Sequence, residues 1–387
     1  MNMKTKIFYP VFSSGRNNNS DFSKSTKIVN TSVLCFWLTD AKNGVKKMRK
    51  FLLLFLALLM MSYSQINAQG VTKKGTTAGA FLGIDVGPRA ISMGSAYVSV
   101  ANDVSAMYWN PAGISKIENF EASFSNTNWI ADLSFNYAGI VFPLGGVGNI
   151  GLNATFLTMG QIERTTIENP DGTGELFDAA SYAFGLSFAR NLTDQFSIGF
   201  NIKYINERVY HVSATGFALD VGTLFNTGLN GLTLGMSISN YGTKMRLDGR
   251  DLNFQTDVAP NINGNNQSIN AELQTDSYEL PLMFRVGVSM DVLKGMGNSN
   301  LILSADALHP NDDVEYVNVG GEYVFYNILS LRAGYKGLFA KESEQGISLG
   351  GGVHYTLLES ATFYFDYSYV NFGRFNAVNT FSVSLGF

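Results

Sequence analysis

The chain is short of the residues that soluble proteins place on their surfaces. Only 15% of its 387 residues are charged, and it contains one Cys and 8 Pro. Average soluble domains carry about 25% charged residues, and a single Cys excludes a disulfide scaffold. No uninterrupted apolar run reaches the roughly 20 residues of a membrane-spanning helix. Aromatic residues and glycine are abundant instead, with 29 Phe, 18 Tyr and 40 Gly. Apolar material spread along the chain in this way is typical of a transmembrane β-barrel.

The longest apolar run has the form of an export signal. Met48-Arg49-Lys50 precedes the apolar residues 51–61, and small and polar residues follow as far as Ala68. A basic start, an apolar centre and a small residue before the cut are the parts of a secretory signal peptide. We expect residues 48–68 to be a signal peptide rather than an anchoring helix, because no stop-transfer pattern follows. Residues 1–47 are polar, and we interpret them as a mis-assigned start or a disordered extension.

Cleavage after Ala68 would make the protein strongly acidic. Residues 1–68 hold ten basic and two acidic groups, so the remaining 319 residues carry 17 basic and 29 acidic groups, a net charge of −12. Cys35 is lost with the same segment, which leaves no thiol for a disulfide or a lipid anchor. We expect no nucleic-acid partner, because nucleic-acid binding depends on neutralising phosphates.

From about Phe120 onward, large apolar residues alternate with small or polar ones. In the last segment, the apolar positions are Phe381, Val383, Leu385 and Phe387. A soluble β-sandwich also alternates, but its outer face is usually rich in Lys, Glu and Thr. Here the polar face is mostly Gly, Ser, Asn and Ala, which favours a crowded lumen behind a wall that faces lipid. The terminal strand resembles the C-terminal recognition signal of outer-membrane barrels, with the barrel assembly machinery and outer-membrane lipid as the expected partners.

Fourteen such strands are predicted, starting near residues 119, 131, 148, 181, 195, 214, 231, 279, 299, 315, 329, 346, 361 and 378. A sheet in hydrocarbon has to close, because its backbone groups find no water. We therefore predict an all-β fold, an antiparallel transmembrane β-barrel of about 14 strands over residues 119–387. Connections after even-numbered strands are short, and the two longest, residues 161–180 and 241–278, follow odd-numbered strands. Outer-membrane barrels have this parity of short periplasmic turns and longer external loops.

Residues 69–118 have no strand pattern and too little apolar material for a separate core. Small residues with a few large ones favour short, closely packed helices. Pro88 suits a first helical turn, and Asn102-Asp103 can cap a second helix that Asn110-Pro111 and Gly113 would end. We predict that this segment is a short helical hatch inside the barrel lumen.

The hatch motif resembles that of FadL-like outer-membrane proteins, and most of all the PorV/PorQ family among them. The residues that carry the resemblance are Arg89, Met93, Gly94, Asn110, Pro111, Ala112 and Gly113, and it continues at residues 306–310, 320–323, 331–335 and 365–369. The resemblance implies a non-enzymatic, fourteen-stranded barrel with an internal hatch in the bacterial outer membrane.

The family resemblance implies two alternative roles. PorV-like members serve type IX protein secretion, with a secretion translocon and secreted cargo proteins as partners. FadL-like members pass long-chain fatty acids or other hydrophobic small molecules through the barrel. This chain is most similar to a generic PorV/PorQ paralogue, so we expect a role in protein secretion or surface assembly, with a hydrophobic channel as the alternative.

Side chains alternate between the two faces of each predicted strand, and this alternation places nine charged residues on the inward face of the predicted barrel. They are Glu121, Lys203, Asp220, Arg285, Asp306, Glu322, Arg332, Lys336 and Asp366. The same charges on the lipid face would be costly near the midplane of the bilayer. They form either a network that braces the hatch or a gate whose rearrangement opens a path.

We expect no catalytic residues, no metal and no cofactor. Gly146, Gly148 and Gly151 match the dinucleotide pattern, but a strand pattern follows them where a helix would be needed. The three His lie on separate segments, and a zinc site needs several convergent ligands. Residues 241–278 are long for a barrel connection, and we interpret them as a mobile surface loop or as a docking site for a protein partner.

Overall fold

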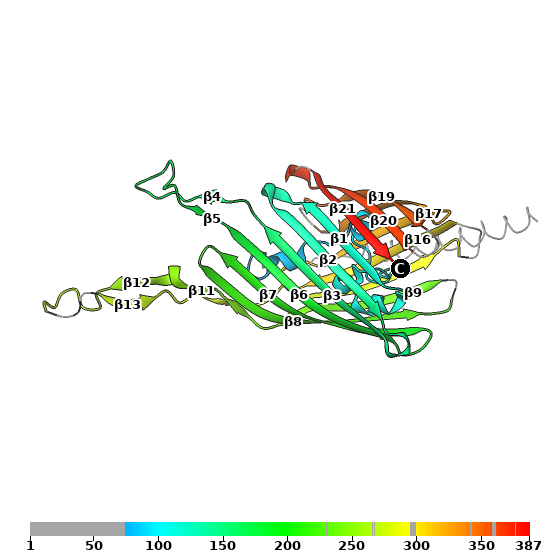
Figure 1. The fold of residues 1–387 in the computed structure, drawn as a ribbon, viewed down its shortest axis with the longest axis horizontal. Helices are drawn as coiled ribbons and strands as arrows, with labels where there is room; N and C mark the ends of the chain where they lie inside the picture. Colours follow the sequence, from blue (N-terminus) through cyan, green and yellow to red (C-terminus); the bar gives the residue numbers. More distant parts are fainter. Residues whose placement is uncertain are drawn as a thin grey trace, which may run out of the picture. The chain divides into compact units, whose positions relative to one another are not determined.

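Fourteen long antiparallel strands form one sheet that closes on itself (Figure 1). The computed structural model describes residues 74–387, apart from residues 230, 265, 267, 295–298, 341–342, 358–360 and 376. The expected signal peptide and residues 1–47 lie outside the described residues. Pairing runs in sequence order around the wall, and β1 pairs with β21 to join the first and last strands. None of the described helices is long and apolar enough to cross a membrane.

The prediction of fourteen barrel strands is confirmed, and each strand begins within four residues of its predicted start. The strands are β1 Glu121–Asn128, β2 Ser134–Pro143, β3 Asn149–Thr158, β6 Ala179–Asn191, β7 Phe196–Val209, β8 Val212–Asn226, β9 Leu232–Gly242, β15 Met283–Asp291, β16 Ser299–Pro310, β17 Tyr316–Phe325, β18 Leu329–Leu338, β19 Ile347–Leu357, β20 Ala361–Asn371 and β21 Ala377–Gly386. Gly146 and Gly148 of the dinucleotide-like pattern lie at the β2–β3 turn, where η4 spans Gly145–Val147, and Gly151 lies in β3.

The two long connections contain paired strands of their own. The β3–β6 connection forms a hairpin of β4 Ile162–Glu163 and β5 Leu176–Phe177. The β9–β15 connection contains β10 Met245–Arg246, β11 Asp248–Gly249, η5 Arg250–Leu252, β12 Asn253–Thr256, β13 Ile269–Glu272 and β14 Ser277–Tyr278. In Figure 1, β4–β5 and β12–β13 extend past the same ends of the long strands. This end of the barrel therefore carries the long loops, as the parity predicts.

The outer face of the wall is apolar along most of the strands. Phe184, Leu186 and Phe188 of β6 and Phe200 and Ile202 of β7 are all between 39% and 57% exposed. The C-terminal residues Phe381, Val383 and Phe387 are about half exposed on the same face, at 54%, 48% and 57%. An apolar surface of this extent is stable in lipid and not in water, so the wall is that of a transmembrane barrel.

The hatch fills the lumen with short helices and turns. Its elements are η1 Ala80–Gly83, α2 Pro88–Ser92, α3 Ala106–Trp109 and η2 Pro111–Lys116. Pro88 stands in the first turn of α2, as predicted. Met93, Tyr97, Met107 and Trp109 are fully buried, and they belong to the largest apolar cluster among the described residues. The remaining short helices, η3 Ile130–Asp132 and η6 Gly373–Phe375, lie in loops.

Two details of the predicted hatch are wrong. Asp103 does not cap a helix directly, because α3 begins only at Ala106; instead its carboxylate accepts hydrogen bonds from the backbone and hydroxyl of Ser105. Gly113 does not end the segment either. Asn110 ends α3, and its side chain accepts a hydrogen bond from Ala112 N, which starts a new 3₁₀ turn through Lys116.

Glycines in the wall let the hatch backbone touch the strands. A Cβ at Gly320 of β17 would lie 2.1 Å from the carbonyl oxygen of Met93, and one at Gly334 of β18 would lie 2.1 Å from Gly94 N. Gly199, Gly222, Gly235 and Gly350 are in similar contact with hatch atoms. Any larger side chain at these positions would force the hatch away from the wall.

We expect Gly320→Ala to destabilise the barrel by about 1–3 kcal/mol, the usual cost of overpacking. Gly321→Ala is the matched control, since that Cβ points to the outer face and meets the end of the Leu303 side chain at 3.2 Å and the carbonyl oxygen of Ile302 at an ordinary contact distance of 3.7 Å. Urea denaturation of the refolded protein, followed by its heat-modifiable mobility in gels, measures both. Equal stability of the two variants would contradict this packing.

Candidate functional site

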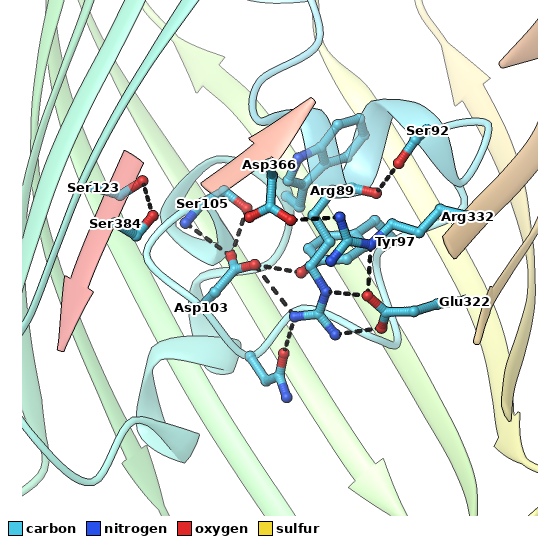
Figure 2. A network of polar contacts seen from close by, with 12 residues as sticks. Arg89, Ser92, Tyr97, Asp103, Ser105, Ser123, Glu322, Arg332, Asp366 and Ser384 are labelled. Carbon is cyan, nitrogen blue, oxygen red and sulfur yellow. Dashed lines mark hydrogen bonds and ion pairs between the residues drawn. The ribbon is translucent and has the colours of Figure 1, made fainter. Parts of the chain in front are cut away.

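A buried ion-pair network joins the hatch to the wall at Glu322 of β17 (Figure 2). Arg89 of α2 donates from Nε to Glu322 Oε1 at 2.9 Å and from Nη2 to Oε2 at 2.7 Å. Arg332 of β18, directly opposite Glu322 in register, donates from Nε to Oε1 at 2.7 Å. The side chains of Glu322 and Arg332 are 1% and 0% exposed. Two guanidinium groups thus share one carboxylate in the lumen.

Each arginine has a second carboxylate partner. Arg332 Nη1 donates to Asp366 Oδ1 of β20 at 2.6 Å. Arg89 Nη1 donates to Asn102 Oδ1 at 2.6 Å and lies 3.3 Å from Asp103 Oδ2. Tyr97 donates its hydroxyl to the same Asp103 oxygen at 2.5 Å. The network therefore links three wall strands to α2 and to the hatch residues Tyr97, Asn102 and Asp103.

A second polar network contacts α3 of the hatch. Lys203 of β7 forms an ion pair with Asp220 of β8, with Nζ 2.9 Å from Oδ2. Asn201 Nδ2 donates to Asp220 Oδ2 at 3.0 Å and to the carbonyl oxygen of Met107 at 3.2 Å. Asp220 Oδ1 accepts from Asn240 N at 2.7 Å, beside the β8–β9 register shift. Asn240 also accepts a hydrogen bond from Lys203.

Three of the other predicted inward charges each make a separate contact with the hatch. Asp306 of β16 accepts from Val98 N at 2.8 Å. Lys336 of β18 pairs with Asp85. The Arg285 guanidinium lies over the rings of Trp109 and Tyr108, at 5.4 and 5.8 Å from their centroids. Such contacts add to the bracing of the hatch through cation–π attraction and hydrogen bonds.

The nine predicted lumen charges thus fall into two networks and a few separate contacts. Glu121, at the start of β1, lies near Asp103 and Val104 of the hatch and forms no ion pair with the described residues. The sequence predicts Asp103 only as a helix cap, and no pattern in it identifies Asp85 or Tyr97 as partners of the lumen charges. The adjacent residues Asn102-Asp103 begin thirteen residues after Arg89. They are the sequence feature that could have identified the hatch partners in the first network.

The predicted hatch motif serves as the contact between hatch and wall. Asn110 Nδ2 donates to the carbonyl oxygens of Val98 at 2.7 Å and Thr223 at 3.0 Å. Gly94 has a φ of 64°, which a side chain rarely adopts, and its N donates to Ser348 Oγ at 2.9 Å. Met93, Pro111, Ala112 and Gly113 are buried. These residues have no exposed reactive group.

An apolar pocket of about 430 Å³ lies among the long loops. Its walls are residues Arg164, Phe177, Val209, Tyr210, Val212, Leu247, Asp251, Leu252 and Thr275. They come from the β4–β5 hairpin, the β7–β8 turn and the β9–β15 connection. The Phe177 and Tyr210 rings meet edge to face, with centroids 6.3 Å apart. The pocket is therefore assembled from three separate loops.

Polar pairs at the rim hold these loops together. Tyr210 donates its hydroxyl to Glu175, and Arg164 Nη1 donates to Glu175 Oε2 at 2.7 Å. These two hydrogen bonds, that of Tyr210 first, hold the pKa of the Glu175 carboxyl below its ordinary value. On the other side, His211 Nδ1 lies 3.1 Å from Asp251 Oδ1.

Below the loops, apolar side chains continue into the lumen. Met245, two residues before the lining residue Leu247, is 1% exposed and packs against the inner face of β8 at Gly216. Met245 and Leu280 belong to the same buried cluster as Phe81 of the hatch. The apolar pocket thus stands above a closed, apolar column of side chains that reaches the hatch.

Comparisons with known proteins bear on the fold. No protein-family model matches the chain, and no curated protein matches it. The solved structure of the CymD monoaromatic hydrocarbon channel is similar over 78% of this chain and 97% of its own, with 12% identity and a TM-score of 0.51. The chain has the fold of that channel.

Two further solved structures match at lower TM-scores. The Ralstonia pickettii toluene transporter TbuX gives a TM-score of 0.47 at 11% identity, over 78% of this chain and 97% of its own. A Pseudomonas aeruginosa FadL homologue gives 0.47 at 15% identity, over 82% and 99%. At such low sequence identity, the similarity between these structures and this chain concerns the fold alone.

We expect Arg332→Met to destabilise the barrel by about 3–5 kcal/mol, because it leaves Asp366 and part of Glu322 as uncompensated buried charges. Arg374→Met is the control. It removes the same group from a loop pair with Glu344, where the arginine side chain is 85% exposed, so little change is expected. The urea midpoint and the temperature of the heat-modifiable gel shift measure the difference. Equal midpoints for both variants would refute the bracing role.

Proposed function

We propose that this chain is an outer-membrane channel for hydrophobic small molecules of the FadL-like kind, and that it has no catalytic step. The observation that carries the proposal is the apolar pocket of about 430 Å³ at the long-loop end. Ligand pockets are commonly roughly 300–1,000 Å³ and lined by apolar and aromatic side chains. The shared fold with a monoaromatic hydrocarbon channel supports the same proposal.

The pocket has the chemistry of a capture site for an apolar molecule that arrives from outside. Phe177, Val212 and Leu252 offer apolar surface, while the charged groups of Arg164 and Asp251 are paired at the rim. An apolar solute gains free energy there by leaving water, at about 25 cal/mol for each Å² removed from water. Long-chain fatty acids and monoaromatic hydrocarbons are the substrate classes that we propose.

Transport requires the hatch to move. Met245, Leu280 and the hatch residue Leu82 are between 1% and 5% exposed, so the column below the pocket is filled. Since that column is apolar, an apolar solute can replace its contacts without leaving polar groups unpaired. The two ion-pair networks are made by other residues, and they would keep the remainder of the hatch in place. We infer that only the apolar column rearranges during passage.

Protein secretion is the second candidate function, and the exposed hairpins favour it. Ile167, Val258 and Ile262, on the β4–β5 and β12–β13 hairpins, are 96%, 72% and 63% exposed. The two long connections also carry eleven acidic and only four basic residues. Exposed aliphatic side chains beside acidic groups suit docking of a translocon or a secreted cargo protein outside the cell, as the PorV/PorQ resemblance implies.

We expect Leu247→Asp to weaken binding of N-phenyl-1-naphthylamine about tenfold, because it places a charge in the apolar pocket. The fluorescence of this probe rises in apolar surroundings, so a titration of the purified mature protein gives the affinity. Val258→Asp makes the same change at a position that is 72% exposed, and its affinity should equal that of the unaltered protein. If Leu247→Asp binds the probe as tightly as this control, the capture site is wrong.

Deleting residues 253–272 removes the β12–β13 hairpin and should leave barrel folding intact, because the long strands and the hatch lie outside it. Under the secretion alternative, the deletion strain should lose secreted proteins from its surface. A surface proteome that matches the parent strain would reject that alternative. The probe titration above is expected to be unchanged by the deletion, so the two functions are tested separately.

A further inference from the structure

A polar cavity of about 260 Å³ lies at the opposite end of the lumen from the apolar pocket. His354 is three residues from the end of β19, Ser384 is two from the end of β21, and Glu121 is the first residue of β1. All three positions adjoin the short-turn end of the barrel. Hatch residues around Arg89 and Asp103 form the facing wall. The cavity shares no lining residue with the apolar pocket.

Two neighbouring cross-strand rows of polar side chains form the floor of the cavity. Strand pairing places His354, Tyr364, Ser384 and Ser123 in one row across β19, β20, β21 and β1. The next row contains Asp366, Ser382, Ser125 and Tyr137. Figure 2 shows Ser123 and Ser384 joined by a hydrogen bond, which is 2.8 Å long. Five adjacent strands, β19, β20, β21, β1 and β2, therefore contribute polar groups to one hollow.

Two of these hydroxyls have no partner within the described part of the protein. Ser125 and Ser382 are 4% and 8% exposed and line the cavity. Neither side chain makes a hydrogen bond to another described residue. Both residues line the cavity, so an occupant can reach their hydroxyl groups. These two groups therefore point to an occupant that carries hydrogen-bonding atoms.

The charges around the cavity do not balance. Four carboxylates line it, those of Asp103, Glu121, Glu322 and Asp366. Two guanidinium groups compensate them, because Arg89 is shared by Glu322 and Asp103, and Arg332 is shared by Glu322 and Asp366. Within the described residues, no cationic group pairs with Glu121. The cavity therefore favours an occupant with positive charge.

The geometry excludes a small metal ion as that occupant. No three His, Cys, Asp or Glu side chains of the described residues converge closely enough to hold a metal. The carboxylates instead surround a space several times larger than an ion, and the His354 and Tyr364 rings, with centroids 4.8 Å apart, add aromatic surface. Alkylammonium groups bind such combinations of carboxylates, hydroxyls and aromatic rings.

We propose that this cavity binds a primary alkylammonium group, supplied either by a free diamine or by a lysine side chain of another protein. Glu121 accepts the ammonium as the carboxylate without an ion-pair partner among the described residues. Ser125 and Ser382 lie four residues along β1 and β21 from the Glu121 row and accept a second hydrogen-bonding group of the occupant, while Asp103 and Asp366 add negative potential. The occupant would fill the space between the hatch and strands β19, β20, β21 and β1.

Isothermal titration calorimetry on the mature protein purified from membranes tests this assignment. The probes are 1,4-diaminobutane, Nα-acetyl-lysine methylamide and the neutral isostere 1,4-butanediol. We expect at least one amine to bind and the diol to give no heat. Binding of the diamine alone identifies a free amine as the ligand class, and binding of the lysine derivative alone identifies a protein side chain. Binding of neither amine, or equal binding of the diol, overturns the proposal.

Glu121→Gln should weaken amine binding about tenfold, the loss expected for one charge-assisted hydrogen bond. Glu118→Gln is the matched control, because Glu118 is exposed, lies three residues away and does not line the cavity. Ser123→Leu fills the cavity without removing a carboxylate, and it replaces Glu121→Gln if that variant fails the heat-modifiability test for folding. Unchanged affinity in a folded cavity variant, or an equal loss in Glu118→Gln, places the amine elsewhere and refutes the site.

Discussion

The pairing of every backbone N–H and C=O group across the wall is the constraint on which this structure depends. In hydrocarbon an unpaired backbone group costs several kcal/mol, so β1 has to find β21 at the far end of the chain. Eight residue pairs, from Glu121 with Gly386 to Asn128 with Asn379, make that junction. Once the sheet is closed, side-chain alternation leaves only two environments, lipid outside and a narrow lumen inside. The apolar outer face and the polar inner face both follow from this division.

The lumen is then the place where charge and close backbone contact can coexist. Wall glycines such as Gly320 and Gly334 allow the hatch backbone to contact the strands directly. Charged side chains therefore fit only in the spaces between these backbone contacts. Glu322 and Arg332 occupy one such space with almost no exposure to solvent. The hatch is therefore positioned by shape at the glycines and by charge at the ion pairs. The apolar pocket and the polar cavity lie at the two ends of this packed region.

The sequence predicted the barrel well because period two is a local property of each strand. Phe381, Val383 and Phe387 could be assigned to the outer face from their spacing alone, and strand starts followed from the same alternation. Partner choice inside the lumen was harder to predict. Arg332 faces Glu322 across one strand pair, but Arg89 reaches Glu322 over 233 residues of sequence, and no local pattern encodes that distance. The helix limits around Gly113 also escaped prediction, because the Asn110 side chain restarts a turn there. The loop pocket could not be foreseen, since three connections contribute to it.

The hatch also dictates an order of assembly. Its residues come before the first strand, yet Arg89, Gly94 and Val98 bind to β17, β18, β19 and β16, which are among the last strands of the chain. These contacts span more than 200 residues, and contacts of such separation slow folding because long loops must close first. The hatch can therefore make these contacts only after the last strands have joined the wall. Docking of the hatch and pairing of β1 with β21 therefore belong to the same late stage of folding. A barrel that closed before the hatch docked would leave the hatch outside the lumen.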